Sequence, residues 1–403
     1  MQLPYLTSDL PGIGGQAKQR VEDFQVDELP LYEPCGEGTH VYFRVRKRGV
    51  PTPAAVDRIA RYMGRLPGEI GIAGLKDAHA VTTQMMSLEH ADAAKLARYR
   101  DGQVEVLATT RHTNKLRPGH LAANRFAIRI RGVGAEQLSG AQAVLDVLIR
   151  RGVPNYFGPQ RFGARHDTAD LGAALVRSDL EEFVAILLGR PKDDDPPDCK
   201  AAREAFEAGQ FDQALKHWPR HYSNERRALS AYRKRTSARA AAAAVHKRMK
   251  RLYTSAFQSA LFNEVLAARL EGIDRVEVGD LAQKCDTGGV FRVEDAEAEQ
   301  PRAERFEISP TGPIFGYRVS LADGEPGKLE RAVLARHDLD KEDFRHVGPM
   351  KLKGTRRALR FRIESPTLTD GSDSRGSFLE LTFTAPSGCY ASIVLHEIMK
   401  TEG

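Results

Sequence analysis

Alternating apolar and polar positions predict strands near the N-terminus of the chain. Phe24 and Val26 alternate with charged residues, which predicts a short half-buried strand. Residues 41–48 alternate Val and Phe with arginine, and residues 124–131 alternate Phe and Ile with arginine in a similar way. Because successive side chains of a strand point to opposite faces, both segments predict strands with a basic outer face.

Two helices are predicted between these strands and after them. The first has Thr52 as its expected N-cap, Pro53 in its first turn and Gly64 at its end. Its apolar residues recur at helical spacing, so one face is expected to pack on a core. A second helix is predicted from about residue 135 to residue 150.

A short apolar run interrupted by polar residues follows the first predicted helix. Residues 70–73 are mostly apolar and end at a glycine, after which Lys76 and Asp77 stand next to each other. This order predicts a strand, then a tight turn that carries the two charged residues, then a second strand from about Val81. The turn therefore presents a carboxylate at a strand end.

The middle of the chain has a different pattern. Residues 226–251 contain ten Lys or Arg and no Asp or Glu, and an alanine run within them favours a helix that continues beyond residue 251. Residues 293–307 are acidic and are predicted to form a loop. After about residue 352 the strand pattern returns. Strands, then helices, then strands predict an insertion within a β-rich domain.

Composition narrows the possible classes of protein. The chain has 403 residues and a net charge of +6, which fits two or three domains and permits a polyanionic partner. Its four cysteines form no CxxC pair and its histidines form no HExxH spacing, so we expect no structural metal. No phosphate-binding loop or dinucleotide-binding glycine motif occurs, so we expect no cofactor. No membrane segment or secretory signal is visible, which predicts a cytoplasmic protein. The oligomeric state is not predicted, although a monomer is favoured.

Asp77 is the candidate for chemistry in the predicted turn. A carboxylate held at a strand end can be aimed rigidly, as a nucleophile must be. The alternative is a carboxylate that only stabilises its turn, and the pattern by itself favours that alternative.

Basic and aromatic residues also occur together. Arginines on the two predicted strand faces, the helix at 226–251 and the segment 152–163, which contains Tyr156, Phe157 and Phe162, could neutralise phosphates and stack on unpaired bases. The alternative is a solvated face over an ordinary core. The segment 386–391 places small residues around Tyr390, which permits close approach of a ligand or makes a plain turn.

Five motifs in order along the chain resemble the TruD family of tRNA pseudouridine synthases. They are Glu22-Asp23-Phe24; Ala73-Gly74-Leu75-Lys76-Asp77 followed by Ala80-Val81-Thr82 and Gln84; Asn124-Arg125-Phe126; residues 152–163; and residues 386–392. The match covers both ends of the chain. The sequence departs from the family at Ala78-His79, where many members carry arginine, and at Tyr390, where some carry Phe.

The resemblance implies an enzyme that isomerises a uridine of tRNA to pseudouridine, with Asp77 as the nucleophile. For bacterial members the implied target is the uridine at position 13 in the D arm. The resemblance also implies substrate-binding roles for five residues. Tyr390 would stack on the flipped base, Phe24 and Phe126 would wall the pocket, Lys18 would provide a cation near Asp77, and Asn124 would bind the base or fix the loop that bears Asp77.

The family fold implied is a mixed α/β fold of the α+β type. A catalytic domain with a curved antiparallel sheet, at residues 1–157 and 353–403, would be interrupted by a TruD-specific α/β insertion domain at residues 158–352, with the RNA between the two. Two other functions stay open. A non-catalytic RNA-binding or chaperone protein could keep the fold, and a glycosidase could act on free nucleosides. The pair Lys76-Asp77 argues against the first, and the basic segments argue against the second.

Overall fold

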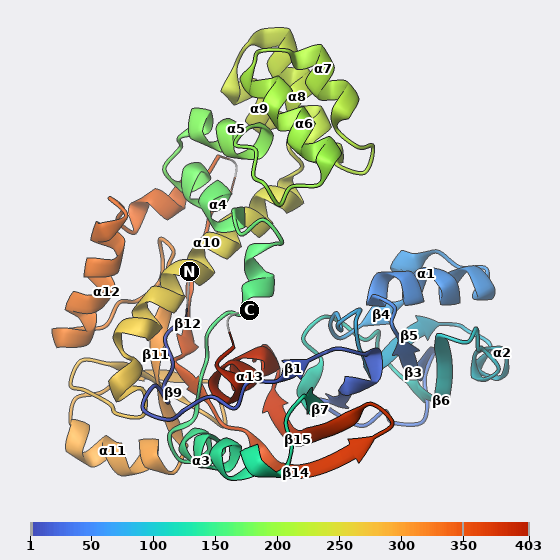
Figure 1. Ribbon diagram of the computed structural model, residues 1–403, viewed down its shortest axis with the longest axis vertical. Helices are drawn as coiled ribbons and strands as arrows, with labels where there is room; N and C mark the ends of the chain where they lie inside the picture. Colours follow the sequence, from blue (N-terminus) through green and yellow to red (C-terminus); the bar gives the residue numbers. More distant parts are fainter. Residues whose placement is uncertain (1–2, 349, 402–403) are drawn as a thin grey trace. The chain divides into compact units, whose positions relative to one another are not determined.

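A computed structural model describes residues 3–348 and 350–401, which form two compact units (Figure 1). The first, here called the sheet unit, comprises Pro4–Val153 and the segment that begins at Phe361. The second, the central unit, comprises Leu3 and Pro154–Arg360. The chain passes between the units after Leu3 and again within the short strands β8 (Val153–Pro154) and β13 (Arg360–Phe361). The domain borders at 157/158 and 352/353 stay a prediction.

The sheet unit is built on a nine-stranded sheet, whose main path runs in the order β14-β15-β7-β2-β5-β3-β6. β1 adds to β7 and β4 adds to β5. Every pair is antiparallel except β2 and β5, which are parallel. The strands are β1 (Gln16–Ala17), β2 (Phe24–Pro30), β3 (His40–Arg48), β4 (Gly71–Ile72), β5 (Val81–Glu89), β6 (Val104–His112), β7 (Leu121–Arg131), β14 (Glu364–Asp373) and β15 (Gly376–Pro386).

One row of buried side chains crosses five strands of this sheet. Its members are successive cross-strand partners on β3, β5, β2, β7 and β15, namely Lys47, Thr82, Val26, Phe126 and Phe383. Directly paired residues point to the same face, so the row marks one face of the sheet. On β3 the same face continues through Val45 and Phe43, which share a core cluster with the apolar stripe of α1. Helix α1 therefore covers one part of this face.

The helices of the sheet unit are α1 (Thr52–Met63), α2 (Ala93–Ala97), α3 (Ala135–Arg151) and α13 (Ala391–Met399), with single 3₁₀ turns η1 (Val21–Asp23) and η2 (Pro67–Glu69). The left-handed Gly64, with φ of 70°, ends α1 as predicted. In α13 the fully buried Glu397 accepts hydrogen bonds from the backbone N–H groups of Leu6 and Thr7 and from the Thr7 hydroxyl. The two ends of the chain are thus joined within one unit.

The central unit combines helices with a four-stranded antiparallel sheet in the order β10-β9-β11-β12. Its helices α4 to α9 form one cluster, from which α10 leads toward the sheet (Figure 1). The elements are α4 (Thr168–Val176), α5 (Leu180–Leu188), α6 (Pro197–Glu207), α7 (Phe211–His217), α8 (Ser223–Arg235), α9 (Ala238–Ala244), α10 (Lys247–Ala268), β9 (Leu281–Lys284), β10 (Val290–Arg292), α11 (Ala296–Glu304), β11 (Ile308–Ile314), α12 (Gly324–Arg336), β12 (Thr355–Ala358) and the 3₁₀ turns η3 (Pro159–Phe162), η4 (Leu270–Gly272) and η5 (Glu342–Arg345).

The prediction of one continuous helix from residue 226 past residue 251 is wrong. Three helices, α8, α9 and α10, cover this segment. Thr236 takes a left-handed conformation with φ of 45° and ends α8, and the Ser237 side chain then caps α9. A second break follows α9, and the His246 side chain caps α10. The predicted loop at 293–307 is also corrected, because α11 forms there with Asp295 as its N-cap.

The arginines of the predicted basic strand faces form ion pairs within the sheet unit, and Arg131 is buried. On β3, the Arg46 guanidinium lies 2.5 Å from a carboxylate oxygen of Glu105. The Arg44 guanidinium lies 3.9 Å from a carboxylate oxygen of Asp27. On β7, Arg129 lies 2.7 Å from Glu380, and the buried Arg131 lies 2.6 Å from Asp23 and 2.9 Å from Asp373. Carboxylates thus lie close to all four arginines, and a contact of these strand faces with nucleic acid stays a prediction.

The other main fold predictions are confirmed. Strands lie at 24–30, 40–48, 81–89 and 121–131, a helix covers 135–151, and the chain has the expected mixture of helices with mainly antiparallel sheets. Within the described ranges, none of the helices combines the length and hydropathy that a membrane span requires.

Candidate active site

Two loops meet because β2 and β5 run parallel. In a parallel pair the starts of both strands lie at the same end, so the segments that lead into them become neighbours. Lys18 stands in the segment before β2, and Asp77 stands in the segment before β5. The Lys18 Nζ lies 2.9 Å from the Asp77 Oδ2, and the two side chains are 27% and 37% exposed. The carboxylate is thus held by a cation and is still open to solvent.

Aromatic rings lie beneath this ion pair. The Lys18 Nζ is 4.0 Å from the centre of the Phe24 ring, a cation–π contact. Phe24 packs edge-on against Phe126 with ring centres 6.0 Å apart, and Phe126 stacks on Phe383 at 5.1 Å. The ammonium therefore contacts an apolar floor on one side and the carboxylate on the other.

The backbone at Lys18 has an uncommon conformation. Its φ is 58°, in the left-handed region that residues other than glycine rarely occupy. The Lys18 carbonyl oxygen lies 3.0 Å from Nε2 of His79, so a protonated Nε2 donates to it. Two contacts thus link the two loops, one through the Lys18 side chain and one through its backbone. Strained conformations of this kind are often found at functional sites.

Thr52 and Gln84 hold the loop that bears Asp77. The prediction that Thr52 is the N-cap of the first helix is wrong, because Pro51 occupies that position and Thr52 is the first helical residue. Its buried hydroxyl instead accepts from the Lys76 backbone N–H at 3.0 Å and donates to Gln84 Oε1 at 2.8 Å. The Gln84 amide in turn donates to the Gly74 carbonyl at 3.2 Å. The start of α1 therefore anchors residues 74–76.

Lys47 supports the same loop from the sheet. It belongs to the buried row that crosses the sheet, and its Nζ donates to the Asp77 carbonyl at 2.6 Å and to the Lys76 carbonyl at 3.4 Å. The pKa of Lys47 is lowered to about 8, mainly because the side chain is buried; the charge of Asp77 opposes this shift, and the charge of Lys76 adds to it. Lys47 is a fully buried cation whose hydrogen-bond partners are backbone carbonyls at the candidate nucleophile.

Lys76 points away from solvent, toward the sheet. Its Nζ lies 2.7 Å from Oε2 of Glu28, and both side chains are almost fully buried. The same Nζ donates to Asn124 Oδ1 at 2.9 Å. Asn124 had two predicted roles, and this contact favours the one in which it fixes the loop that bears Asp77.

Tyr390 lies on a separate segment of the sheet unit. It is half-buried and forms the N-cap of α13, just after a turn in which Gly388 has φ of 81°. The preceding strand β15 ends beside β7, with Ala385 paired to Asn124. Of the six predicted site residues, Lys18, Phe24, Asp77, Asn124 and Phe126 are joined by a chain of contacts that includes Lys76. The role of Tyr390 stays a prediction.

Three supporting residues were not predicted, namely Glu28, Lys47 and Thr52 in its loop-binding role. Lys47 carries a signal in the sequence, since it falls on the apolar side of the alternation formed by Val41, Phe43 and Val45. A lysine at such a position needs a buried acceptor. Glu28 also falls on the buried side of its strand.

The arrangement can present an oriented carboxylate to a ligand. Asp77 has its backbone fixed by Lys47, its neighbours fixed by Thr52 and Gln84, and its charge stabilised by Lys18. Such preorganisation suits a nucleophile, which must approach its target in a narrow range of geometry. Within the described ranges, no three His, Cys, Asp or Glu side chains are placed to hold a metal ion.

Comparisons with known proteins identify the family of the chain. The sequence model of the family described as tRNA pseudouridine synthase D (TruD) matches residues 1–398. The chain is 44% identical to the tRNA pseudouridine synthase D of Geobacter sulfurreducens, over 99% of this chain and 97% of the relative. It is 43% identical to the protein of the same name from Geotalea daltonii, over 99% of this chain and 100% of the relative.

A solved structure is also similar over the whole chain. It is the crystal structure of a Methanosarcina mazei protein named as a candidate tRNA pseudouridine synthase D (TruD). The two structures agree with a TM-score of 0.86 at 28% sequence identity, and the match covers 100% of this chain and 99% of the other. The expected mixed α/β fold is thereby confirmed. The chain belongs to the tRNA pseudouridine synthase D (TruD) family.

Proposed function

We propose that this tRNA pseudouridine synthase isomerises a uridine in the D arm of tRNA, at position 13, with Asp77 as its nucleophile. Family membership supports the isomerase activity. The observation that carries the role of Asp77 is its place in the site. It is a half-exposed carboxylate that Lys18 contacts at 2.9 Å and that Lys47 holds through the backbone. The proposed enzyme acts as a single chain in the cytoplasm.

The proposed reaction conserves every atom of the uridine. Asp77 attacks either the ribose or the base ring, the bond between N1 and C1′ breaks, and the uracil turns while it stays bound. A bond between C5 and C1′ then forms, the bond to Asp77 breaks and frees its carboxylate, C5 loses its proton, and N1 gains one. The product is an isomer of the substrate, so the reaction needs no oxidant, reductant or group carrier.

The site residues have distinct roles in this proposal. The target uridine leaves its stack to reach the carboxylate. Phe24 and Phe126 provide an apolar wall, and Tyr390 stacks on the extruded base. Lys18 stabilises the negative charge of Asp77 before attack and contacts a phosphate once the substrate enters. Asn124 acts through Lys76, as a positioning residue.

Lys47 is a further positioning residue in this proposal. Its ammonium fixes the carbonyl of Asp77 and therefore the direction in which the side chain leaves the backbone. A loop displaced by about 1 Å can cost roughly 100-fold in rate, so this contact matters to turnover more than to tRNA affinity.

The decisive experiment compares Asp77→Asn with the wild-type protein on unmodified tRNA. We expect pseudouridine formation to fall by roughly 1,000-fold or more while tRNA binding stays within about twofold, because the substitution removes the nucleophile and keeps the shape. Asp27→Asn is the matched control, since Asp27 is an exposed carboxylate on the solvent side of β2. Pseudouridine is mapped at single-nucleotide resolution, and free uracil is measured in parallel.

Each result separates the proposal from its alternatives. Wild-type protein that binds tRNA without modifying it would favour a non-catalytic RNA-binding protein. Release of uracil from nucleosides would favour a glycosidase. An Asp77→Asn protein with normal activity would remove Asp77 as the nucleophile, and modification at a different uridine would correct only the target.

A further inference from the structure

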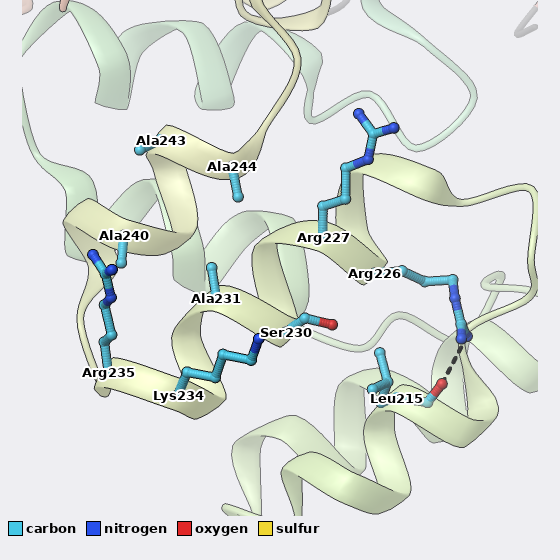
Figure 2. Close-up of a pocket in the computed structure, with 10 residues that line it drawn as sticks. All are labelled: Leu215, Arg226, Arg227, Ser230, Ala231, Lys234, Arg235, Ala240, Ala243 and Ala244. Carbon is cyan, nitrogen blue, oxygen red and sulfur yellow. Dashed lines mark hydrogen bonds between the residues drawn. The ribbon is translucent and has the colours of Figure 1, made fainter.

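Helices α8 and α9 form an open pocket with a basic rim. Its volume is about 530 Å³, and Figure 2 shows the side chains that line it. Alanines of both helices make up most of its interior, while basic side chains of α8 surround it. The lining consists of Leu215, Arg226, Arg227, Ser230, Ala231, Lys234, Arg235, Ala240, Ala243 and Ala244, so no acidic side chain takes part.

Three cations at this rim have no carboxylate partner. Arg227, Lys234 and Arg235 are exposed, and none of them forms an ion pair with another residue in the part of the chain that the structure describes. The neighbouring Arg233 shows the opposite case, because it forms an ion pair with Asp212. Arg226 donates to the carbonyl oxygens of Leu215 and Trp218 and so holds the end of α7 in place.

The spacing of these cations suits an extended anion. Arg227 and Lys234 are two helical turns apart, so they lie on the same side of α8 at a separation of about 10 Å along its axis. A strand of a nucleic acid duplex carries one phosphate per roughly 3.4 Å of axis, so the rim can contact more than one phosphate of a strand. The Ser230 hydroxyl, placed between them, adds a hydrogen-bond donor.

The pocket lacks the groups that read bases. None of its lining side chains is aromatic, and the aromatic Tyr232 of α8 instead packs against Phe206 and Phe211. Stacking on bases needs aromatic or exposed planar surfaces, whereas contacts with phosphates need only charge and donors. The surface therefore suits the sugar–phosphate backbone and not a particular sequence.

We propose that the basic rim of this pocket, formed by Arg227, Lys234 and Arg235, binds the sugar–phosphate backbone of the tRNA substrate. This inference rests on the proposed function and adds a contact surface in the central unit, apart from the unit that contains Asp77. Exposed cations that form no ion pair with an acidic side chain attract a polyanion, and each contact with a phosphate releases counterions from the nucleic acid. The contact contributes to affinity and leaves the chemical step unchanged.

The test is a triple variant, Arg227→Gln with Lys234→Gln and Arg235→Gln. We expect the KM for tRNA to rise about tenfold near 0.15 M salt, and the slope of log Kd against log salt to fall by roughly 2 to 3. The kcat at saturating tRNA should stay within about twofold. Thermal unfolding should match the wild type, because all three side chains are exposed.

Two control variants test whether the effect depends on charge at this rim or on the net charge of the protein. The variant Arg305→Gln with Lys328→Gln and Arg345→Gln removes three cations from the same unit, but each of these is paired with a glutamate. It should leave KM and the salt slope within about twofold of the wild type. The variant Arg227→Lys with Arg235→Lys keeps the charge and should bind tRNA normally.

Three possible results would each contradict the inference. If the wild type modifies tRNA and the glutamine variant has an unchanged KM and salt slope, the inference fails while the proposed function stands. If both triple variants weaken binding equally, net charge and not this rim is responsible, and the inference fails. If wild-type protein binds vesicles of phosphatidylserine and phosphatidylcholine through these residues while tRNA binding ignores them, the surface belongs to a membrane contact instead.

Discussion

Two basic regions of the molecule, the strands β3 and β7 and the helix α8, carry similar charges in different surroundings. On the strands every arginine discussed above lies close to a carboxylate, and Arg131 is buried between Asp23 and Asp373. On α8, three cations face solvent, and none of them pairs with a carboxylate among the described residues. The positive charge that is free to contact a ligand is therefore the charge that remains after the fold has formed its own ion pairs.

Removal of one partner of a buried ion pair on the strands should reduce stability most. Arg131→Met leaves the fully buried Asp23 without its guanidinium, and uncompensated buried charges cost about 3–5 kcal/mol. We expect the opening free energy of β7 and β15 to fall by this amount, measured by amide hydrogen exchange. Arg227→Met in α8 is the matched control and should change local stability by less than about 0.5 kcal/mol. Equal effects of the two substitutions would contradict the difference between the paired arginines of the strands and the unpaired cations of α8.

Lys47 is a third case, because it is buried on β3 and its ammonium forms no ion pair with a carboxylate of residues 3–348 or 350–401. Its contacts with the carbonyls of Asp77 and Lys76 predict that Lys47→Met lowers kcat by about 10- to 100-fold and leaves the Kd for tRNA within about twofold. Lys115→Met is the control, since Lys115 also donates to a carbonyl, that of Gly68, but is only half-buried and lies outside the loop that bears Asp77. A normal kcat in the Lys47→Met protein would show that the loop needs no such support.

The pH dependence gives Lys47 a readout that a purely structural role would not produce. Its pKa of about 8 in the folded protein lies below the roughly 10.4 of an unfolded lysine. Between about pH 8 and roughly 10.4 the unfolded chain binds more protons at Lys47 than the folded protein does. The contribution of Lys47 to the free energy of unfolding therefore rises with pH in this range. The positive charge beneath Asp77 is lost over the same rise. We therefore expect kcat to decline above about pH 8, and this decline should be absent in Lys47→Met.

The smallest expected effect is on the exposed side of β3. Arg46 already contacts Glu105 at 2.5 Å, and surface pairs contribute about 0–1 kcal/mol. Arg46→Gln should therefore change the KM for tRNA by less than about twofold and leave its salt dependence unaltered. A large rise in KM would show that Arg46 leaves Glu105 to bind a phosphate. In that case both the strands and α8 would contact the RNA.

Much of the fold was predictable because its signals are local. Alternation located the strands around Phe24, Phe43 and Phe126, and Gly64 ended α1 where a left-handed residue was expected. The breaks after Thr236 and Val245 were not predicted, because high helix propensity concealed the capping side chains of Ser237 and His246. Propensity describes a segment, whereas caps are properties of single residues.

The residues proposed to act on the substrate could be predicted from the sequence, whereas most of the residues that hold the loop bearing Asp77 could not. Asp77, Lys18 and the two phenylalanines carry family motifs, so a resemblance could name them. Thr52 was assigned to a helix end, since Ser and Thr favour N-caps, and only the tertiary structure assigns its hydroxyl to Lys76 and Gln84. The carboxylates that neutralise Arg129 and Arg131 lie up to some 250 residues away, beyond any local pattern.

The position of β15 between β7 and β14 has a consequence for synthesis on the ribosome. One side of β7 pairs with β2, but most of its other side must wait for a strand that the ribosome makes about 250 residues later. At roughly 5–20 residues per second this delay lasts on the order of 10–50 s. During that interval the nascent chain exposes an unpaired strand edge, while the whole of Pro154–Arg360 is already complete.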